Sequence, residues 1–347
     1  MDQIQINRLI ADKAFSDTAK NPELIETHIS WVILTDHYAY KIKKPVQYSF
    51  LDFSTLKNRA YFTRRELLLN SRLSEGVYLK RVPIWELSGS YSMEDNGGEI
   101  VDWAVMMRRM SKEKQMNHML REGKVTHQHI DELAEKLATF HKDTKVNFVP
   151  QSLYNLKLDF NDILSYRETA LSISLEAAKT IDRAINTSNR FLLEHQRDFR
   201  VRVDKGYVRD CHGDLHTGNI FLESPPVIFD CIEFNDAWRQ TDILDEVGFL
   251  CMDLEASGAD DLSAYFLQAY LNHVHAFGSP QDEALLIYYK LYRANVRMKV
   301  LLLEFAKNKL QEDSLNAIQN MIGTYVAIIN RYISQLSTPS TIRAQAS

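Results

Sequence analysis

The sequence predicts an α+β protein with a β-rich N-terminal part and a mainly helical remainder. Between residues 26 and 107, β-branched and aromatic runs alternate with short polar turns, which is typical of strands and hairpins. Beyond residue 110, apolar residues recur with the 3.6-residue spacing of helices. The 347 residues contain no fixed-period repeat and no low-complexity linker. We therefore expect one continuous chain with two lobes, at 1–107 and 108–347.

Four strands are predicted in the N-terminal lobe. Residues 31–34 and 38–42 are strand-like runs on either side of a three-residue polar turn. Residues 77–87 and 101–107 form a second pair, divided by a segment rich in glycine, serine and acidic residues. With the helix described next, the predicted order is strand, strand, helix, strand, strand.

One helix is predicted between the two strand pairs, from about Leu56 to Leu73. Ser54 is a plausible N-cap, because its hydroxyl can accept from the first free backbone N–H groups. Phe62 and Leu69 share an apolar stripe with Leu73. Glu66 falls on the same stripe, so we expect its carboxylate to face the sheet.

The C-terminal lobe is predicted to be mostly helical. Its clearest helix covers 127–143, where apolar residues follow the i, i+3, i+4, i+7 pattern. A long helical region fills 155–199, a strand-and-loop stretch covers 206–234, and three helical segments run from about 242 to 336. The last ten residues lack periodicity and are expected to be a frayed tail.

Charge and composition exclude several classes of function. Forty-six acidic residues against 41 basic ones give a net charge of -5, which is the wrong sign for bulk nucleic-acid binding. The N-terminus lacks the basic start and apolar stretch of a signal peptide, and no window resembles a membrane span. The three cysteines form no CxxC pair. A cytoplasmic protein that binds neither nucleic acid nor membranes is expected.

The densest chemical signal lies in residues 208–230. It combines an H-x-D-x-x-x-x-N box, made by His212, Asp214 and Asn219, with Asp230 at the end of an apolar run. Phosphoryl transfer needs a carboxylate that orients the attacking hydroxyl, together with oxygen ligands that hold Mg²⁺ against the nucleotide phosphates. Asp214 suits the first task. Asn219 and Asp230 carry oxygen ligands of the kind that Mg²⁺ accepts.

The run HGDLHTGN…IFD resembles the catalytic and metal-binding loops of the aminoglycoside phosphotransferase and choline kinase group. The resemblance implies a protein-kinase-like two-lobed fold that binds ATP and Mg²⁺ between its lobes. It also implies transfer of the γ-phosphoryl group to a hydroxyl of a small molecule. In that group the matching positions make Asp214 the catalytic base, and Asn219 and Asp230 the metal ligands.

A second likeness lies upstream, in THISWVILTDHYAYKIKKPVQYSFLDFSTLKNR. This run is similar to an uncharacterised bacterial branch in which the domain is often fused to a P-loop ATPase or kinase. The G-x-x-x-x-G-K-[ST] pattern of a P-loop does not occur in this sequence. A separately encoded P-loop ATPase is therefore a possible partner.

A lysine that contacts the α- and β-phosphates is predicted on the strand 38–42. Protein kinases place it in a V-A-x-K pattern, which Tyr38-Ala39-Tyr40-Lys41 matches. Lys43 lies on the same face one step further along and is the second candidate. Glu66 is the expected ion-pair partner of Lys41.

Two further nucleotide contacts are predicted with less support from side-chain identity. The segment 26–30, where a phosphate loop is expected, has no glycine, so the hydroxyls of Thr27 and Ser30 are candidate phosphate donors. Residues 106–109 are expected to connect the lobes. The resemblance implies that the backbone here, including Met107, contacts the adenine edge.

Several alternatives remain open at this point. The acids that follow Asp230 could form a solvated helix face, which is favoured, or a pocket for a cationic substrate. Arg293 and Arg297 share one helix face, where they could pair with those acids or bind an anionic substrate group. A nucleotide-binding regulator without turnover and a protein Ser/Thr kinase are the alternative functions.

Overall fold

The computed structural model describes residues 1–15, 17, 22–48, 50–149, 152–275, 277–307 and 312–337. It divides into two compact units. The sheet unit comprises Met1–His118 and Asn219–Trp238, and the helical unit comprises Met119–Gly218 and Arg239–Ser347. The predicted division of the chain is a single boundary at 107/108. In the structure, the segment 219–238 belongs to the sheet unit instead of the helical one. The predicted α+β class is confirmed.

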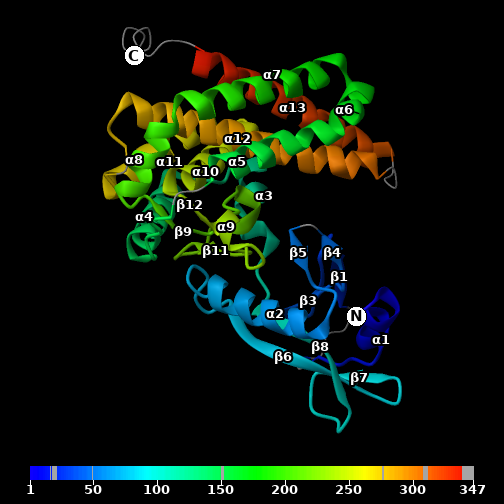
Figure 1. The fold of residues 1–347 in the computed structure, drawn as a ribbon. Helices are drawn as coiled ribbons and strands as arrows, with labels where there is room; N and C mark the ends of the chain where they lie inside the picture. Colours follow the sequence, from blue (N-terminus) through cyan, green and yellow to red (C-terminus); the bar gives the residue numbers. More distant parts are fainter. Residues whose placement is uncertain are drawn as a thin grey trace. The chain divides into compact units, whose positions relative to one another are not determined.

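The sheet unit is built on six antiparallel strands in the order β1-β2-β3-β8-β6-β7. In Figure 1 they are the blue to cyan arrows. The strands are β1 (Glu23–Glu26), β2 (Ser30–Leu34), β3 (Tyr38–Lys43), β6 (Tyr78–Leu87), β7 (Ser90–Ser92) and β8 (Glu99–Arg108). The four strands predicted from the sequence are β2, β3, β6 and β8, so the two strands at the edges were missed.

The two faces of this sheet have different neighbours. Tyr40 and Ile42 of β3 belong to an apolar cluster with Ile6 and Leu9 of α1 (Gln3–Ala11), a helix that the sequence analysis did not predict. Side chains alternate along a strand, so Ala39, Lys41 and Lys43 lie on the opposite face. That second face carries helix α2 (Leu56–Asn70), because both lysines pair with Glu66 of that helix. Figure 1 shows α2 beside β6 and β8.

Helix α2 begins at Leu56 as predicted, but it ends at Asn70 rather than Leu73, and its N-cap and its buried face also differ from the prediction. Thr55 is the N-cap and accepts from the backbone N–H of Asn58, while the expected cap, Ser54, bonds Asp52 instead. The expected apolar stripe is only partly right: Leu73, just beyond the helix, is buried and Glu66 faces inward as predicted, but Phe62 and Leu69 are only half-buried. The buried side of the helix is polar and consists of Arg59, Thr63, Glu66 and Asn70. This face meets buried charges and hydrogen-bonding groups, which an apolar side chain could not satisfy.

Short elements complete the sheet unit. They are β4 (Gln47–Tyr48), β5 (Leu51–Asp52), the 3₁₀ turn η1 (Lys112–Lys114), β10 (Ile220–Phe221) and β11 (Val227–Ile228). The strands β10 and β11 pair antiparallel, with Ile220 opposite Ile228. Two short helices, α3 (Met116–Arg121) and α9 (Asp236–Arg239), lie where the chain passes from one unit to the other.

The helical unit contains the predicted helix 127–143 as α4 (His127–Asp143). The region 155–199 is broken into α5 (Leu153–Asn161), η2 (Asp162–Tyr166), α6 (Arg167–Ile173), α7 (Leu175–Glu194) and α8 (Gln196–Asp204). The stretch after 206 contains β9 (Val208–Asp210), η3 (Thr217–Asn219) and β12 (Gln240–Asp242). Beyond it run α10 (Ile243–Ala256), α11 (Asp260–His273), α12 (Pro280–Ala306) and α13 (Glu312–Ser337), which are four helices where three were predicted.

The core of the helical unit lies where α7, α10, α12 and α13 meet. Figure 1 shows α13 running beside α7 and α12, and these helices share one buried apolar cluster.

No helix in the described part of the chain is both long enough and apolar enough to cross a membrane. The predicted tail lies outside the described residues.

Candidate active site

Two lysines of β3 lie on the face of the sheet that carries α2. Lys41 Nζ is 2.8 Å from Oε1 of Glu66 and 2.5 Å from Oδ1 of Asp230. Lys43 Nζ is 2.7 Å from Oε2 of the same Glu66 and also bonds Glu233. The ion pair expected between Lys41 and Glu66 is therefore present. Five charges form one chain, in the order Asp230, Lys41, Glu66, Lys43, Glu233.

The two ends of this charge chain differ in exposure. The Lys43 and Glu233 side chains are 1% and 4% exposed, whereas those of Lys41 and Asp230 are 12% and 43% exposed. An anionic ligand could reach Lys41 and Asp230 but not Lys43. This difference separates the two lysines that the sequence left as alternatives.

Burial and neighbouring charges shift the pKa values in the chain. Burial lowers the pKa of Lys41, but Asp230 and Glu66 outweigh it and leave that pKa well above its usual value. Burial raises the pKa of Glu66, yet Lys41 and Lys43 together bring it down to about 2. Burial raises the pKa of Glu233, and Lys43 offsets this only in part. Glu66 is therefore the firmly ionised centre of the chain.

The β10–β11 hairpin brings the two predicted metal ligands to one end. Asn219 directly precedes β10, Asp230 follows β11 by two residues, and the Phe229 N–H donates to the Asn219 carbonyl at 3.0 Å. Asp230 has φ = +64°, a left-handed conformation that is uncommon outside glycine. Residues held in this region often cluster at functional sites.

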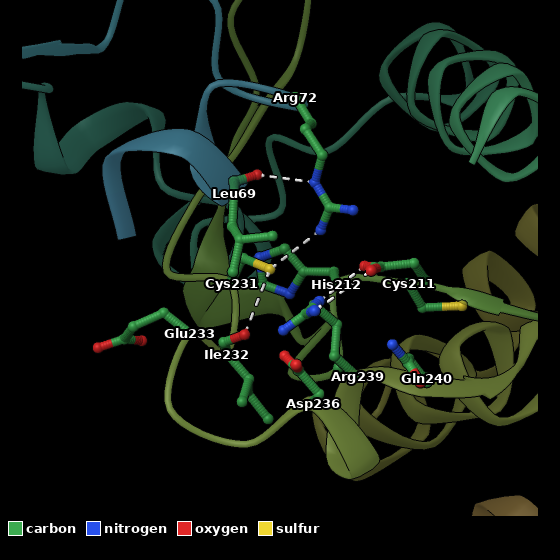
Figure 2. Close-up of polar contacts among 12 residues, drawn as sticks. Leu69, Arg72, Cys211, His212, Cys231, Ile232, Glu233, Asp236, Arg239 and Gln240 are labelled. Atoms are coloured by element: carbon green, nitrogen blue, oxygen red, sulfur yellow. Dashed lines mark hydrogen bonds and ion pairs between the residues drawn. The ribbon is translucent and has the colours of Figure 1, made fainter. Parts of the chain in front are cut away.

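Helix α2 and the turn after it form hydrogen bonds with the segment that follows Asp230. The Cys231 N–H donates to Asn70 Oδ1 at 2.8 Å, and the Arg65 Nε–H donates to the Glu233 carbonyl at 3.0 Å. Figure 2 shows Arg72 pointing toward the Leu69 carbonyl and the Cys231 sulfur, with distances of 2.9 and 3.4 Å. The buried polar side of α2 thus holds the backbone of 231–233 as well as the two lysines.

An apolar cluster lies on the same face of the sheet. Its members come from β2, β3, β6, β8 and the β10–β11 hairpin, and include Val32, Leu34, Ala39, Tyr78, Val105, Met107, Met110, Phe221, Val227 and Phe229.

Met107 pairs with Ala39 on one side and with Tyr78 on the other. Residues 106–108 therefore belong to β8, and the prediction that they connect the lobes is wrong because both neighbouring strands extend the ladder that far.

The hydroxyls predicted as phosphate donors have other surroundings. Thr27 Oγ1 accepts from the Ser30 N–H at 2.9 Å and donates to the Ser30 carbonyl at 3.1 Å, which closes the turn. The Ser30 side chain is fully buried, and its hydroxyl finds no hydrogen-bond partner in the described part of the chain. Their role as phosphate donors remains a prediction.

Asp214 belongs to the helical unit, in the loop that follows β9. The N–H groups of His212 and Gly213 both donate to Glu246 Oε1 at 2.7 Å. Gly213 has φ = +88°, which favours glycine at this turn. Glu246 is held from its other oxygen by His141 at 2.7 Å. A buried carboxylate thus fixes the two residues that precede Asp214.

The Asp214 carboxylate itself is 39% exposed and lies 3.6 Å from His216 Nε2. Burial raises the pKa of Asp214, but the charges of His216 and Arg297 outweigh it and hold the pKa well below its usual range. The carboxylate is therefore ionised at neutral pH, as a group that accepts a hydrogen bond or a proton must be.

The acids after Asp230 are mostly buried, which corrects the favoured interpretation of a solvated face. Asp242 is 1% exposed and bonds Arg202 through both oxygens at 2.7 Å. Asp245 is 4% exposed and is paired with Arg293. Buried carboxylates need such partners because desolvating an unpaired charge is costly. These acids hold the helical unit together.

Sequence reasoning missed two residues that shape the site. Asn70 was not singled out, although a hydrogen bond to the backbone beside Asp230 depends on it. Glu246 was counted only as one of several acids. No periodicity identifies either residue, because a polar side chain at a buried helical position is visible only once its partner is known.

Comparison of the sequence with known proteins gives relatives that are uncharacterised. No family model matches the chain. Uncharacterised proteins of Mycobacterium tuberculosis and Mycobacterium bovis are 30% identical to it over 320 residues, which is 90% of this chain. The chain spans 60% of the length of these relatives.

Solved structures of small-molecule kinases resemble the chain. An amicoumacin kinase bound to AMP-PNP and Ca²⁺ has a TM-score of 0.55 at 12% identity and covers 94% of each chain. A choline kinase from Cryptosporidium parvum scores 0.53 at 11% identity, covering 96% of this chain and 97% of its own. An aminoglycoside 2'-phosphotransferase IIIa bound to GDP scores 0.51 at 13% identity, covering 94% and 98%.

At these identities the likeness shows the fold. The chain has the kinase-like fold of the aminoglycoside phosphotransferases and choline kinases, as the motif resemblance predicts.

Proposed function

We propose that the chain is an ATP- and Mg²⁺-dependent phosphotransferase that moves the γ-phosphoryl group to a hydroxyl of a small molecule. One observation carries the proposal. Lys41, Glu66 and Asp230, which are far apart in the sequence, meet in one charge chain whose exposed end is formed by Lys41 and Asp230. Phosphoryl transfer in the protein-kinase arrangement uses a lysine held by a carboxylate next to a metal-binding aspartate, and this cluster has that composition.

The residues present suit Mg²⁺. Asn219 and Asp230 offer an amide oxygen and a partly exposed carboxylate from one end of the β10–β11 hairpin, and Mg²⁺ prefers such hard oxygen ligands. When bound there, the ion would neutralise charge on the nucleotide phosphates. Lys41 would contact the same phosphates, with Glu66 holding its ammonium group in place.

The apolar cluster beside Ala39 would take the adenine ring. Its aliphatic and aromatic side chains from β2, β3, β8 and the hairpin lie on the face of the sheet that also carries Lys41. A planar base gains dispersion and hydrophobic energy against such side chains. The base and the phosphates would then be bound by residues of the sheet unit.

Asp214 would orient the acceptor hydroxyl and accept its proton. Its carboxylate is ionised and partly exposed, and its backbone is fixed by Glu246 through the two preceding residues. Fixing a group in this way lowers the entropic cost of bringing it to the reacting atom.

The test is incubation of the full chain with γ-labelled ATP and Mg²⁺. Aminoglycosides, amino alcohols, sugars, sugar acids and a generic protein serve as acceptors, and water alone measures hydrolysis. We expect transfer to a small molecule, with both transfer and hydrolysis lost on omission of Mg²⁺. Nucleotide binding without transfer or hydrolysis would favour the regulator, and transfer to the generic protein alone would favour a protein kinase.

A further inference from the structure

Arg293 and Arg297 lie four residues apart on α12 but have different surroundings. Arg293 donates through Nε and Nη2 to the two oxygens of Asp245, at 2.7 and 2.5 Å, and through Nη1 to the Gly213 carbonyl at 3.0 Å. All three of its nitrogens are engaged. Arg293 therefore pairs with an acid and fixes the backbone next to Asp214.

Arg297 lies one helical turn further along and has no such pair. Its Nε–H is buried and meets no acceptor in the described part of the chain. None of the described carboxylates lies within 4.0 Å of its guanidinium, although the charges of Asp214 and Asp253 act on it. The guanidinium donates a hydrogen bond to the hydroxyl of Tyr325 in α13. The residue as a whole is half-buried, and an arginine keeps its charge in such surroundings, so the unfilled buried donor is costly.

The two nearest acids are engaged elsewhere. Asp253 Oδ2 accepts from the Thr217 N–H at 2.8 Å and from the Thr217 hydroxyl at 2.6 Å. Asp214 lies beside His216. Arg297 is thus a half-buried cation whose charge acts on the proposed catalytic carboxylate, and its Nε–H is not used by the described part of the chain.

We infer that Arg297 is a specificity-determining residue that binds a carboxylate or phosphate group on the acceptor. The inference rests on the proposed function and names its substrate class: a small hydroxy acid or phosphorylated alcohol. An arginine can donate two parallel N–H groups to the two oxygens of such a group, which makes the contact bidentate. The acceptor hydroxyl would then be oriented toward Asp214 by its own anionic group.

A binding experiment tests the anion site independently of turnover. The full chain, with its nucleotide site filled by AMP-PNP and Mg²⁺, is titrated calorimetrically with inorganic phosphate and with D-glycerate. We expect saturable binding that weakens at least about thirtyfold in Arg297→Gln, the range for removing one partner of a buried charge pair. Lys299→Gln removes the same charge from a half-buried position on α12, where the lysine is paired with Asp162, and should bind like the natural chain.

Arg297→Lys keeps the charge without the planar fork and covers the case in which Arg297→Gln does not fold. It should bind these anions with intermediate affinity. Equal affinities in the natural chain and a folded Arg297 variant, or no anion binding at all, would overturn the inference.

A kinetic experiment distinguishes two anionic groups that Arg297 could bind: a group on the acceptor and the transferred phosphoryl group itself. Matched acceptors such as glycerol and D-glycerate, or glucose and gluconate, are compared, and ATP hydrolysis in water is measured alongside. We expect the anionic members to be preferred, and Arg297→Gln to lose that preference while hydrolysis is retained. Equal loss of hydrolysis would assign Arg297 to the phosphoryl group instead. Arg297-dependent anion binding in a chain without any ATP turnover would keep the site and overturn the phosphotransferase.

Discussion

Lys41 Nζ lies 2.5 Å from Asp230 Oδ1, across 189 positions of sequence. Both groups belong to the sheet unit, so the contact depends on the β10–β11 hairpin being part of that unit. It brings the predicted phosphate lysine to the predicted metal ligand. An arriving triphosphate and its metal would exchange this ion pair for contacts of their own.

Substitutions of the two β3 lysines should have different effects. Lys41→Met should weaken ATP binding at least about tenfold, because a charge-assisted phosphate contact is lost. Lys43→Met should leave Glu233 buried without its cation and lower the free energy of unfolding by about 3–5 kcal/mol. Nucleotide titration and denaturant unfolding of both variants measure this. If Lys43→Met loses nucleotide affinity at unchanged stability, the two assignments are reversed.

Asp214→Asn should remove turnover and spare nucleotide binding. The amide cannot accept the hydroxyl proton, so we expect kcat to fall by about 10²–10⁴-fold. ATP affinity should stay within a factor of two or so, since Asp214 is assigned to the acceptor. Asp204→Asn, an exposed carboxylate of the same unit, is the matched control. Parallel losses of binding and turnover would contradict the assignment as base.

Stability should depend on acid pH through Glu66. Its pKa falls from 4.5 in the unfolded chain to about 2 in the folded protein, so its contribution is present above pH 4.5 and is lost as the pH falls toward 2. The stability difference between the natural chain and Glu66→Gln should therefore shrink by about 1–2 kcal/mol between pH 7 and pH 3. Urea unfolding at both pH values measures it, and a difference that does not change would refute this role.

The Lys43–Glu233 pair should show strong coupling in a double-mutant cycle. Each single change, Lys43→Met or Glu233→Gln, leaves a buried polar partner, whereas the double change removes both. We expect a coupling free energy of about 1–3 kcal/mol. The partly exposed pair of Arg108 and Glu223 serves as control and should give less than about 1 kcal/mol. Similar coupling in the two cycles would mean that burial adds nothing.

The strands and the best amphipathic helix followed from local patterns. Helix 127–143 has the bounds predicted for it, because its apolar spacing and its Thr126 cap are both local signals. The face of α2 was misjudged, since its buried positions are polar and a hydropathy pattern assigns polar residues to solvent. The same error placed the acids after Asp230 on a solvated face. In the structure, arginines distant in sequence pair with these acids and offset the desolvation cost of burying them.

The order of residues along the chain sets which chemical groups are available: a box with Asp214 and Asn219, a distal Asp230, and lysines spaced to share one strand face. The difference between the two lysines arises from the fold, which leaves Lys41 accessible beside Asp230 and encloses Lys43 with Glu233. The fold likewise engages Arg293 fully and leaves a donor of Arg297 unfilled. The physical reason is that residue type sets charge and hydrogen-bonding capacity, whereas burial and pairing depend on neighbours that only the folded chain brings together.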